Sequence, residues 1–217
     1  MNHNFNYCER NSLELLAEPL NAFTNILFII VSLFLLFHYR SKKKPLLAFI
    51  IFMIGISSFL YHTIPIGIWG ALDIFFILLF ILFYLYFVGN KLFILSRPIS
   101  ILMAIAFLFI CYFFGNFFKN TIIGTSAYYL PIVFTLYTLY FLLRKKVLIK
   151  RELFFYTSII FSISVIFRVL DYYLCSFWHI GTHFIWHILN ALTLYLLGKF
   201  YYLNSTEPPQ KNQPRPK

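Results

Sequence analysis

The chain has 217 residues, of which 61% are apolar or aromatic and only 12% are charged, and its mean hydropathy is +0.79. A soluble domain is about half apolar and about a quarter charged, so these charges are too few to cover a water-exposed surface. The composition predicts a membrane protein. Seven helical spans of about 20 residues use about 140 residues, which excludes a separate soluble domain.

The formal net charge of +11 would suggest a nucleic-acid partner in a soluble protein. Here the basic residues lie in short loops between apolar runs, where retention of Lys and Arg in cytoplasmic loops explains them, and no nucleic-acid partner is expected. The first apolar run follows a segment that contains Glu9, Glu14 and Glu18. It therefore lacks the basic start of a cleaved secretory signal and is expected to stay as a span.

Seven apolar runs follow one another along the chain, separated by proline, glycine or charge. They cover residues 22–38, 46–62, 69–87, 99–114, 127–143, 153–167 and 183–203. The predicted fold is an all-α bundle of seven transmembrane helices in one domain, residues 1–203. The segment 204–217 contains four prolines and is predicted to be a disordered cytoplasmic tail.

The basic residues divide unevenly between the two predicted sides of the membrane. Fifteen follow the first, third, fifth and seventh runs, whereas three fall on the other side: Arg10, Lys119 and Arg168. This asymmetry favours an odd number of spans, with the N-terminus outside and the C-terminus in the cytoplasm.

This topology places five unusual polar residues in the outer half of the membrane. Ser58 and His62 lie four residues apart and share a helix face, and so do His183 and His187. The third run starts outside and reaches Asp73 after about one turn, at a similar depth. Ionisable groups at membrane depth are costly and usually face the bundle interior, so they are functional candidates.

Simpler interpretations apply to some of these residues taken singly. A lone serine such as Ser58 usually bonds its own helix backbone. His38 lies at the opposite, cytoplasmic side and is expected to be structural, and His179 is expected in a loop before Gly181. Two imidazoles at positions i and i+4 can bind one metal ion, however, and His62 and Asp73 on the same side strengthen a metal-site hypothesis.

An ordered set of motifs resembles the alkaline ceramidase family of seven-span membrane amidases. The resemblance runs from about residue 7 to residue 196. The same set of zinc ligands also occurs in adiponectin-receptor-like and haemolysin-like proteins of the broader superfamily. The Cys-Glu and Gly-Thr-His elements favour the ceramidase branch. The residues that carry the resemblance are Cys8-Glu9, Glu18-Pro19-Leu20-Asn21, Asn25, Ser58, His62, Asp73, Asp171, Cys175, Gly181-Thr182-His183 and Trp186-His187.

The resemblance implies a zinc ion held by His62, His183 and His187, with Ser58 and Asp73 as catalytic residues beside it. Three imidazoles leave the fourth tetrahedral position of zinc to water, whose pKa falls to about 7. The expected enzyme is a zinc-dependent hydrolase that cleaves ceramide-like lipid amides to a fatty acid and a long-chain amine. Its site would face the outer side, periplasmic or luminal.

In the expected mechanism Asp73 takes the proton from water, and Ser58 either stabilises the oxyanion or acts as a nucleophile. The competing class is a non-catalytic lipid receptor with a structural zinc, favoured if the site is sealed. A proton or ion pathway would need polar residues through several spans, and the inner halves are almost wholly apolar. The particular lipid amide and the oligomeric state are left open.

The resemblance also implies a calcium site near the N-terminus. Its pattern is an Asp-Trp-Cys-Glu-x-Asn segment with a later Glu, and oxygen ligands of this kind suit calcium. In this chain Asn replaces the Asp and Tyr replaces the Trp. The alternative is a helix start at which Asn11 and Glu14 form a cap. The candidate calcium ligands are Asn6, Tyr7, Glu9, Asn11 and Glu18.

The three cysteines have different expected roles. Cys111 lies inside the fourth run and is expected to be a small buried apolar group. Cys8 and Cys175 both fall on the predicted outer side, where an oxidising compartment permits a disulfide. The family resemblance pairs the same two positions, so a bridge between them is expected.

Overall fold

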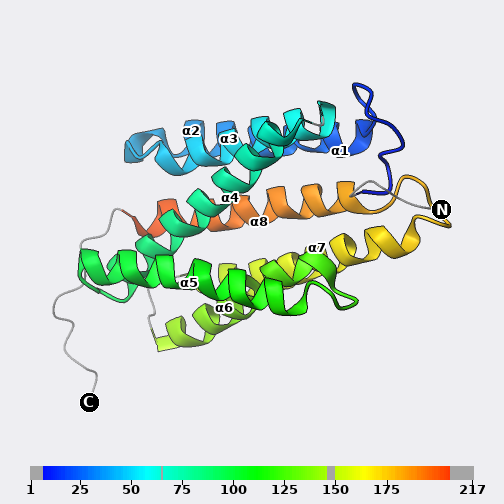
Figure 1. Ribbon diagram of the computed structural model, residues 1–217. Coiled ribbons are helices and arrows are strands. Elements are labelled where there is room, and N and C mark those ends of the chain that lie inside the picture. Colours follow the sequence, from blue (N-terminus) through cyan, green and yellow to red (C-terminus); the bar gives the residue numbers. More distant parts are fainter. Residues whose placement is uncertain (1–6, 65, 146–149, 206–217) are drawn as a thin grey trace, which may run out of the picture.

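The computed structural model describes residues 7–64, 66–145 and 150–205, and these form helices joined by short loops and turns (Figure 1). The predicted all-α fold is thus confirmed, whereas nearly all of the predicted tail, from residue 206, lies outside the described residues. The helices are α1 (Pro19–Thr24), α2 (Ile26–His38), α3 (Leu46–Thr63), α4 (Gly67–Phe87), α5 (Arg97–Phe118), α6 (Leu130–Leu142), α7 (Glu152–Leu174) and α8 (His183–Asn204). Four short turns accompany them: η1 (Arg40–Lys42), η2 (Val88–Leu92), η3 (Gly124–Tyr129) and η4 (Leu143–Lys145).

Each predicted apolar run corresponds to a helical segment, and the first run is divided into α1 and α2 at Asn25. Six segments are long and apolar enough to cross a membrane, the first of them formed by α1 and α2 together. Although α8 is as long as α5, it is not one of the six. It carries His183, His187, Asn190 and Lys199, and these polar residues lower its hydropathy.

Helix α8 lies in the middle of the bundle (Figure 1), where it packs against α7, α2, α1 and α3. Its protein-facing side buries Trp186, Phe200 and Tyr202. This position accounts for its lower hydropathy, because a helix surrounded by other helices needs less lipid-facing apolar surface. The two site histidines on α8 are therefore held deep between helices.

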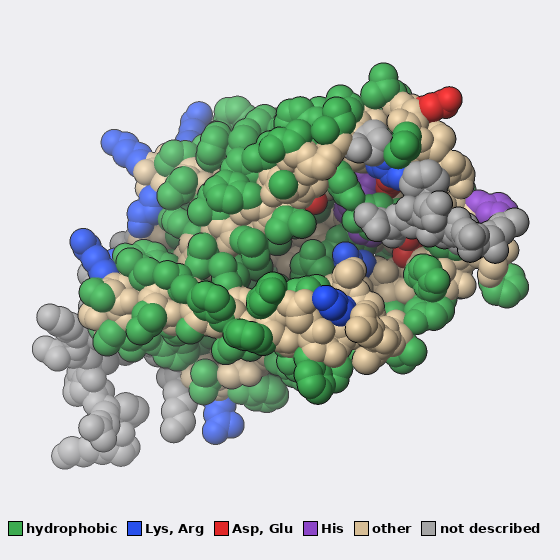
Figure 2. Space-filling view, in the orientation of Figure 1, with side chains coloured by type: hydrophobic (Ala, Val, Ile, Leu, Met, Phe, Trp, Pro, Cys, Tyr) green, Lys and Arg blue, Asp and Glu red, His purple; other side chains and the backbone are tan. Residues whose placement is uncertain are grey.

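The outer surfaces of the helices are apolar, as a lipid environment requires. Large side chains such as Phe34, Phe75, Phe109, Phe113 and Phe134 are about half exposed or more. Hydrophobic side chains cover most of the face in Figure 2, far beyond the apolar patches found on soluble monomers. The apolar surface, like the composition, therefore indicates a membrane protein.

Lys and Arg side chains gather at the left end of the molecule in Figure 2. That end carries the α2–α3 and α4–α5 connections, the end of α6 and the start of α7, as Figure 1 shows. Consecutive long helices run in alternate directions, so these segments lie at the same end of the bundle although they are far apart in sequence. The predicted uneven division of basic residues therefore corresponds to two different ends of the bundle.

The opposite end is held together by the buried Asp171 carboxylate. One of its oxygens accepts backbone N–H groups of Thr182 (2.6 Å) and His183 (2.9 Å), and the other accepts the N–H of Cys8 (3.2 Å). The expected disulfide between Cys8 and Cys175 is confirmed, with Cα atoms 5.1 Å apart. These contacts join the N-terminal segment to the end of α7 and the start of α8.

Gly181 fits between the groups that make this junction. Its φ of +68° is in the left-handed region that favours glycine. A Cβ atom added there would lie 2.2 Å from Asp171 Oδ1 and 2.5 Å from Cys8 Cβ. A side chain at this position would push the carboxylate away from the amides that it accepts.

We expect Gly181→Ala to destabilise the protein markedly, and Gly124→Ala is its matched control. Gly124 has a similar φ of +58°, but a Cβ there meets nothing within 4 Å. In Gly124→Ala the free energy of unfolding should fall by about 1 kcal/mol, which is the cost of a left-handed backbone for alanine. In Gly181→Ala the clash adds to this cost, and the free energy of unfolding should fall by about 3 kcal/mol or more. Thermal unfolding in detergent measures both, and equal melting temperatures would contradict the packing argument.

Candidate metal centre

Three buried histidines converge near the right end of the bundle. His62 lies in the last turn of α3, while His183 begins α8 and His187 follows one turn later. Each offers a ring nitrogen, and these three atoms lie within 4.8 Å of one another. Nitrogen ligands of one tetrahedral zinc ion are about 3.4 Å apart, so small ring rotations complete the geometry. The predicted grouping of these histidines is therefore present.

Two of the histidines have partners that orient their rings toward the centre. His62 Nδ1 lies 2.5 Å from the Glu18 carboxylate. His187 Nδ1 lies 3.0 Å from the backbone carbonyl oxygen of Asn21 and 3.0 Å from the Thr24 hydroxyl. Because a carboxylate or carbonyl oxygen can only accept a hydrogen bond here, we assign the proton to Nδ1, which leaves Nε2 free for a metal ion.

The third histidine is held by stacking. The rings of Tyr7 and His183 are stacked with their centroids 4.0 Å apart. His183 Nδ1 is buried and has no hydrogen-bond partner among the described residues. A buried ring nitrogen without a partner, beside two oriented imidazoles, is a donor set that suits zinc.

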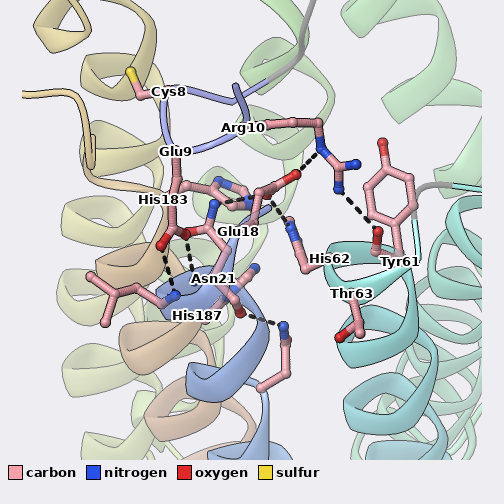
Figure 3. Close-up of polar contacts among 12 residues, drawn as sticks. Cys8, Glu9, Arg10, Glu18, Asn21, Tyr61, His62, Thr63, His183 and His187 are labelled. Carbon is pink, nitrogen blue, oxygen red and sulfur yellow. Dashed lines mark hydrogen bonds and ion pairs between the residues drawn. The ribbon is translucent and has the colours of Figure 1, made fainter. Parts of the chain in front are cut away.

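Glu18 connects the centre to the N-terminal segment (Figure 3). Its carboxylate accepts hydrogen bonds from Arg10 Nε, from Asn21 Nδ2 at 2.9 Å and from His62 Nδ1. Burial opposes ionisation, but the hydrogen bonds from His62 and Asn21 and the Arg10 charge hold the pKa of Glu18 below its usual value. Glu18 is therefore a buried anion that orients a histidine.

Glu9 forms the start of α1 rather than a metal site. Its two carboxylate oxygens accept the backbone N–H groups of Leu20 (2.7 Å) and Asn21 (2.8 Å), at the first turn of that helix. Burial raises the pKa of Glu9, and the two backbone bonds partly offset this effect. The alternative of a helix start capped by Asn11 and Glu14 is wrong, because the first helix begins only at Pro19.

The candidate calcium ligands already have other partners or lie apart from them in the part of the chain that the structure describes. Asn6 lies outside the described residues, and Asn11 is exposed to solvent. The oxygens of Glu9 and Glu18 accept protein N–H groups, and the buried Arg10 guanidinium provides the positive charge beside Glu18. Arg10 also donates to the Tyr61 carbonyl oxygen at 3.2 Å. The calcium prediction thus gains no support, because these carboxylates are already satisfied.

Ser58 and Asp73 lie beside the three histidines, as predicted. Ser58 is one turn before His62 on α3, and it lines the same cavity as Asp73 on α4. Asp73 Oδ1 is buried and has no partner among the described residues. A cavity of about 120 Å³ is lined by both residues together with His62, His183 and His187.

A second, much larger cavity of about 1090 Å³ adjoins the first. Tyr7, Asp73, Tyr129 and Arg168 line both cavities, and the rest of the larger cavity is lined mainly by apolar side chains of α4 and α5, by residues 121–128 and by the end of α7. Figure 2 shows the face hollowed between α4 and α5, with histidine and acidic side chains visible at depth. The site is therefore not sealed. A sealed site would have favoured the alternative of a receptor with a structural zinc.

The histidines considered structural lie away from this centre. His38 is exposed at the end of α2 and stacks on Phe34, with ring centroids 5.3 Å apart. His179 is exposed in the loop between α7 and α8.

Sequence reasoning missed the roles of two residues. Tyr7 was considered only for calcium but stacks on a histidine, and its burial raises its pKa above the usual value. Arg168 was counted only as a residue of the outer side, but it lies inside α7 and lines both cavities. The available signal was a basic residue directly after the apolar run 153–167, followed by the further apolar residues Val169 and Leu170.

Comparison with protein families identifies the chain. A family model described as Ceramidase matches residues 2–215, nearly the whole chain. No significant match was found among curated proteins or solved structures. The chain belongs to the ceramidase family, and this membership implies a membrane hydrolase that acts on the amide bond of ceramide.

Proposed function

We propose that this member of the ceramidase family is a zinc-dependent amidase that cleaves ceramide-like lipids to a fatty acid and a long-chain amine. The observation that carries the proposal is the group of three buried histidines beside Ser58 and Asp73, at the wall of a large apolar cavity. We further propose that residues 1–203 form one catalytic domain and that 204–217 form a cytoplasmic tail.

His62, His183 and His187 would hold the zinc ion. When bound, zinc would supply Lewis acidity toward the carbonyl oxygen and lower the pKa of water. The hydrogen bond between Glu18 and His62 and that between the Asn21 carbonyl and His187 would keep two rings in the ligating orientation. Such second-sphere partners commonly change metal affinity 10- to 100-fold.

Asp73 is the proposed proton carrier. Its buried Oδ1 has no described partner, so it can accept the proton of a water molecule whose oxygen forms the new bond to the amide carbon. The same carboxyl then gives this proton to the leaving nitrogen as the C–N bond breaks. Water and amide are thereby converted to carboxylic acid and amine.

Ser58 is the proposed oxyanion donor. Ser58 lines the cavity together with Asp73 and the histidines, and its hydroxyl can donate to the carbonyl oxygen as negative charge develops there. The alternative, in which Ser58 is the nucleophile of an acyl-enzyme, needs a base other than a metal ligand. The three histidines that line this cavity are all proposed zinc ligands, so Ser58 has no metal-free histidine there as its base, and we favour direct attack by water.

The larger cavity provides the place for the acyl chain or the long-chain base. Its wall includes Ile74, Ile77, Leu108 and Phe109, which offer apolar contact along α4 and α5. Because the cavity adjoins the histidine centre, a lipid amide can present its polar group there while its chains stay in apolar surroundings. A receptor with a structural zinc would not need this access.

The first test concerns zinc. The purified protein should contain about one zinc per chain, and His183→Ala should lose most of it, because two imidazoles hold zinc poorly. Glu18→Gln should weaken zinc affinity about 10- to 100-fold, whereas the exposed Glu14→Gln is the matched control. Metal analysis and competition with a chelator measure both effects. Full zinc occupancy in the triple alanine variant of the three histidines would refute the assignment.

The second test concerns the catalytic pair. Asp73→Asn should abolish hydrolysis of a ceramide while retaining zinc, and Ser58→Ala should lower kcat roughly 10²- to 10³-fold. Ser57→Ala is the control, because that hydroxyl bonds the Met53 carbonyl of its own helix at 2.7 Å. A fatty acyl adduct on Ser58, trapped during turnover and seen by mass spectrometry, would overturn the direct-water mechanism.

The third test concerns orientation. We propose that the basic end of the bundle faces the cytoplasm, so that the N-terminus and the histidine centre face the periplasm or lumen. A reporter fused after Lys217 should then be cytoplasmic, and one inserted beside Lys119 should be external. Location of both reporters on the same side would contradict the seven-span topology.

A further inference from the structure

Arg168 is a cation inside a transmembrane helix, at the wall between the two cavities. It lies six residues before the end of α7 at Leu174, and Asp73 lies six residues after the start of α4 at Gly67. Both helix ends are at the right end of the bundle in Figure 1. At 1.5 Å per residue, both side chains start about 9 Å below that end, so they are at similar depth.

The guanidinium of Arg168 is fixed from two directions. Its Nη1 atom donates to Ser126 Oγ at 2.8 Å and to Thr125 Oγ1 at 3.1 Å. Its central carbon lies 5.2 Å from the ring centroid of Tyr129 and 5.6 Å from that of Trp186. Hydrogen bonds and cation–π contacts thus orient the group without neutralising its charge.

The charge of Arg168 has no ion-pair partner among the described residues. Its Nε and Nη2 atoms donate no hydrogen bond to any described group. The carboxylate of Asp171, on the same helix, is already used by the backbone N–H groups of Cys8, Thr182 and His183. Asp73 interacts with Arg168 electrostatically, but without a contact within ion-pair distance.

A cation placed at membrane depth without an ion-pair partner is costly unless a ligand supplies the opposite charge. Arg168 is also the one basic side chain among the described residues that line the larger cavity. A guanidinium offers a planar set of donors that matches the oxygens of phosphate, sulfonate or carboxylate. The free donors of Arg168 therefore form an anion-binding position next to the proposed reaction site.

We propose that Arg168 recognises an anionic headgroup, so that the preferred substrate is a lipid amide bearing a phosphate or sulfonate close to its amide nitrogen. This inference rests on the proposed amidase function and specifies its substrate class. Arg168 and Asp73 lie at similar depth and line the same two cavities, so the anion would be bound close to the scissile amide. The apolar remainder of the larger cavity takes the chains.

The test compares two lipids that differ in one group. One is a neutral ceramide, and the other is the same ceramide carrying a phosphomonoester on its terminal hydroxyl. The ratio of their kcat/KM values is measured for the wild type and for Arg168→Gln, Arg168→Lys and Lys119→Gln in a neutral detergent. Because the ratio cancels the amount of folded enzyme, a partly misfolded variant still gives an answer.

The wild type should prefer the phosphorylated lipid, and Arg168→Gln should reduce this preference about 10- to 100-fold, as expected for loss of a charge-assisted contact. Arg168→Lys keeps the charge without the planar donor set and should retain part of the preference. Lys119→Gln removes an exposed positive charge bonded to Asn116 and should leave the ratio unchanged. A wild-type preference for the neutral lipid, or an equal loss for both lipids in Arg168→Gln, would overturn the headgroup assignment.

Two further measurements separate the possible failures. If inhibition by the fatty-acid product weakens in Arg168→Gln while the ratio stays constant, the anion bound is the product carboxylate and the headgroup assignment is wrong. Equilibrium binding of both lipids to the protein, followed by tryptophan fluorescence, does not depend on turnover. Absence of hydrolysis of either lipid would refute the proposed function, whereas equal binding of both lipids to wild type and Arg168→Gln would refute the role of Arg168.

Discussion

The carboxylate of Glu18 is the contact on which the rest of the site depends. It is fully buried, and its hydrogen bonds come from an arginine of the N-terminal segment, an asparagine of α1 and a histidine of α3. A buried carboxylate without such partners would be strongly destabilising, so the three segments are required to meet around it. Because one partner is His62, the same requirement fixes a member of the histidine group.

The N-terminal segment is therefore part of the centre, although its sequence is polar and it precedes the first span. Tyr7 stacks on one face of the His183 ring, and Cys8 forms a disulfide at the end of α7. Glu9 accepts backbone N–H groups of the first turn of α1. Arg10 then reaches Glu18. Each side chain of this short segment satisfies a different buried group, so the segment cannot shift without disturbing several of them.

The number and type of elements could be predicted because an apolar run of nearly 20 residues in a membrane usually forms a spanning helix. The grouping of His62, His183 and His187 followed from topology and helical spacing, which bring distant turns to one end of the bundle. The engagement of Glu18 by Arg10 could not be predicted in this way, because it depends on how an irregular segment folds over the helices. Arg168 was counted only in the charge balance, since its neighbours Tyr129 and Trp186 come from other parts of the chain.

The charges near the histidines indicate how many metal ions this end of the bundle can hold. Glu9, Glu18, Asp73 and Asp171 are the carboxyl groups near the histidines, and Arg10 and Arg168 are the cations beside them, so two negative charges remain when all of these groups are ionised. Uncompensated charge is expensive in surroundings of low dielectric constant. One divalent ion on the three neutral imidazoles balances these groups, and a second would leave an excess of two positive charges. Arg10 supplies positive charge beside the Glu18 carboxylate that a cation bound there would otherwise provide, whereas the three neutral imidazoles leave room for the charge of the proposed zinc ion.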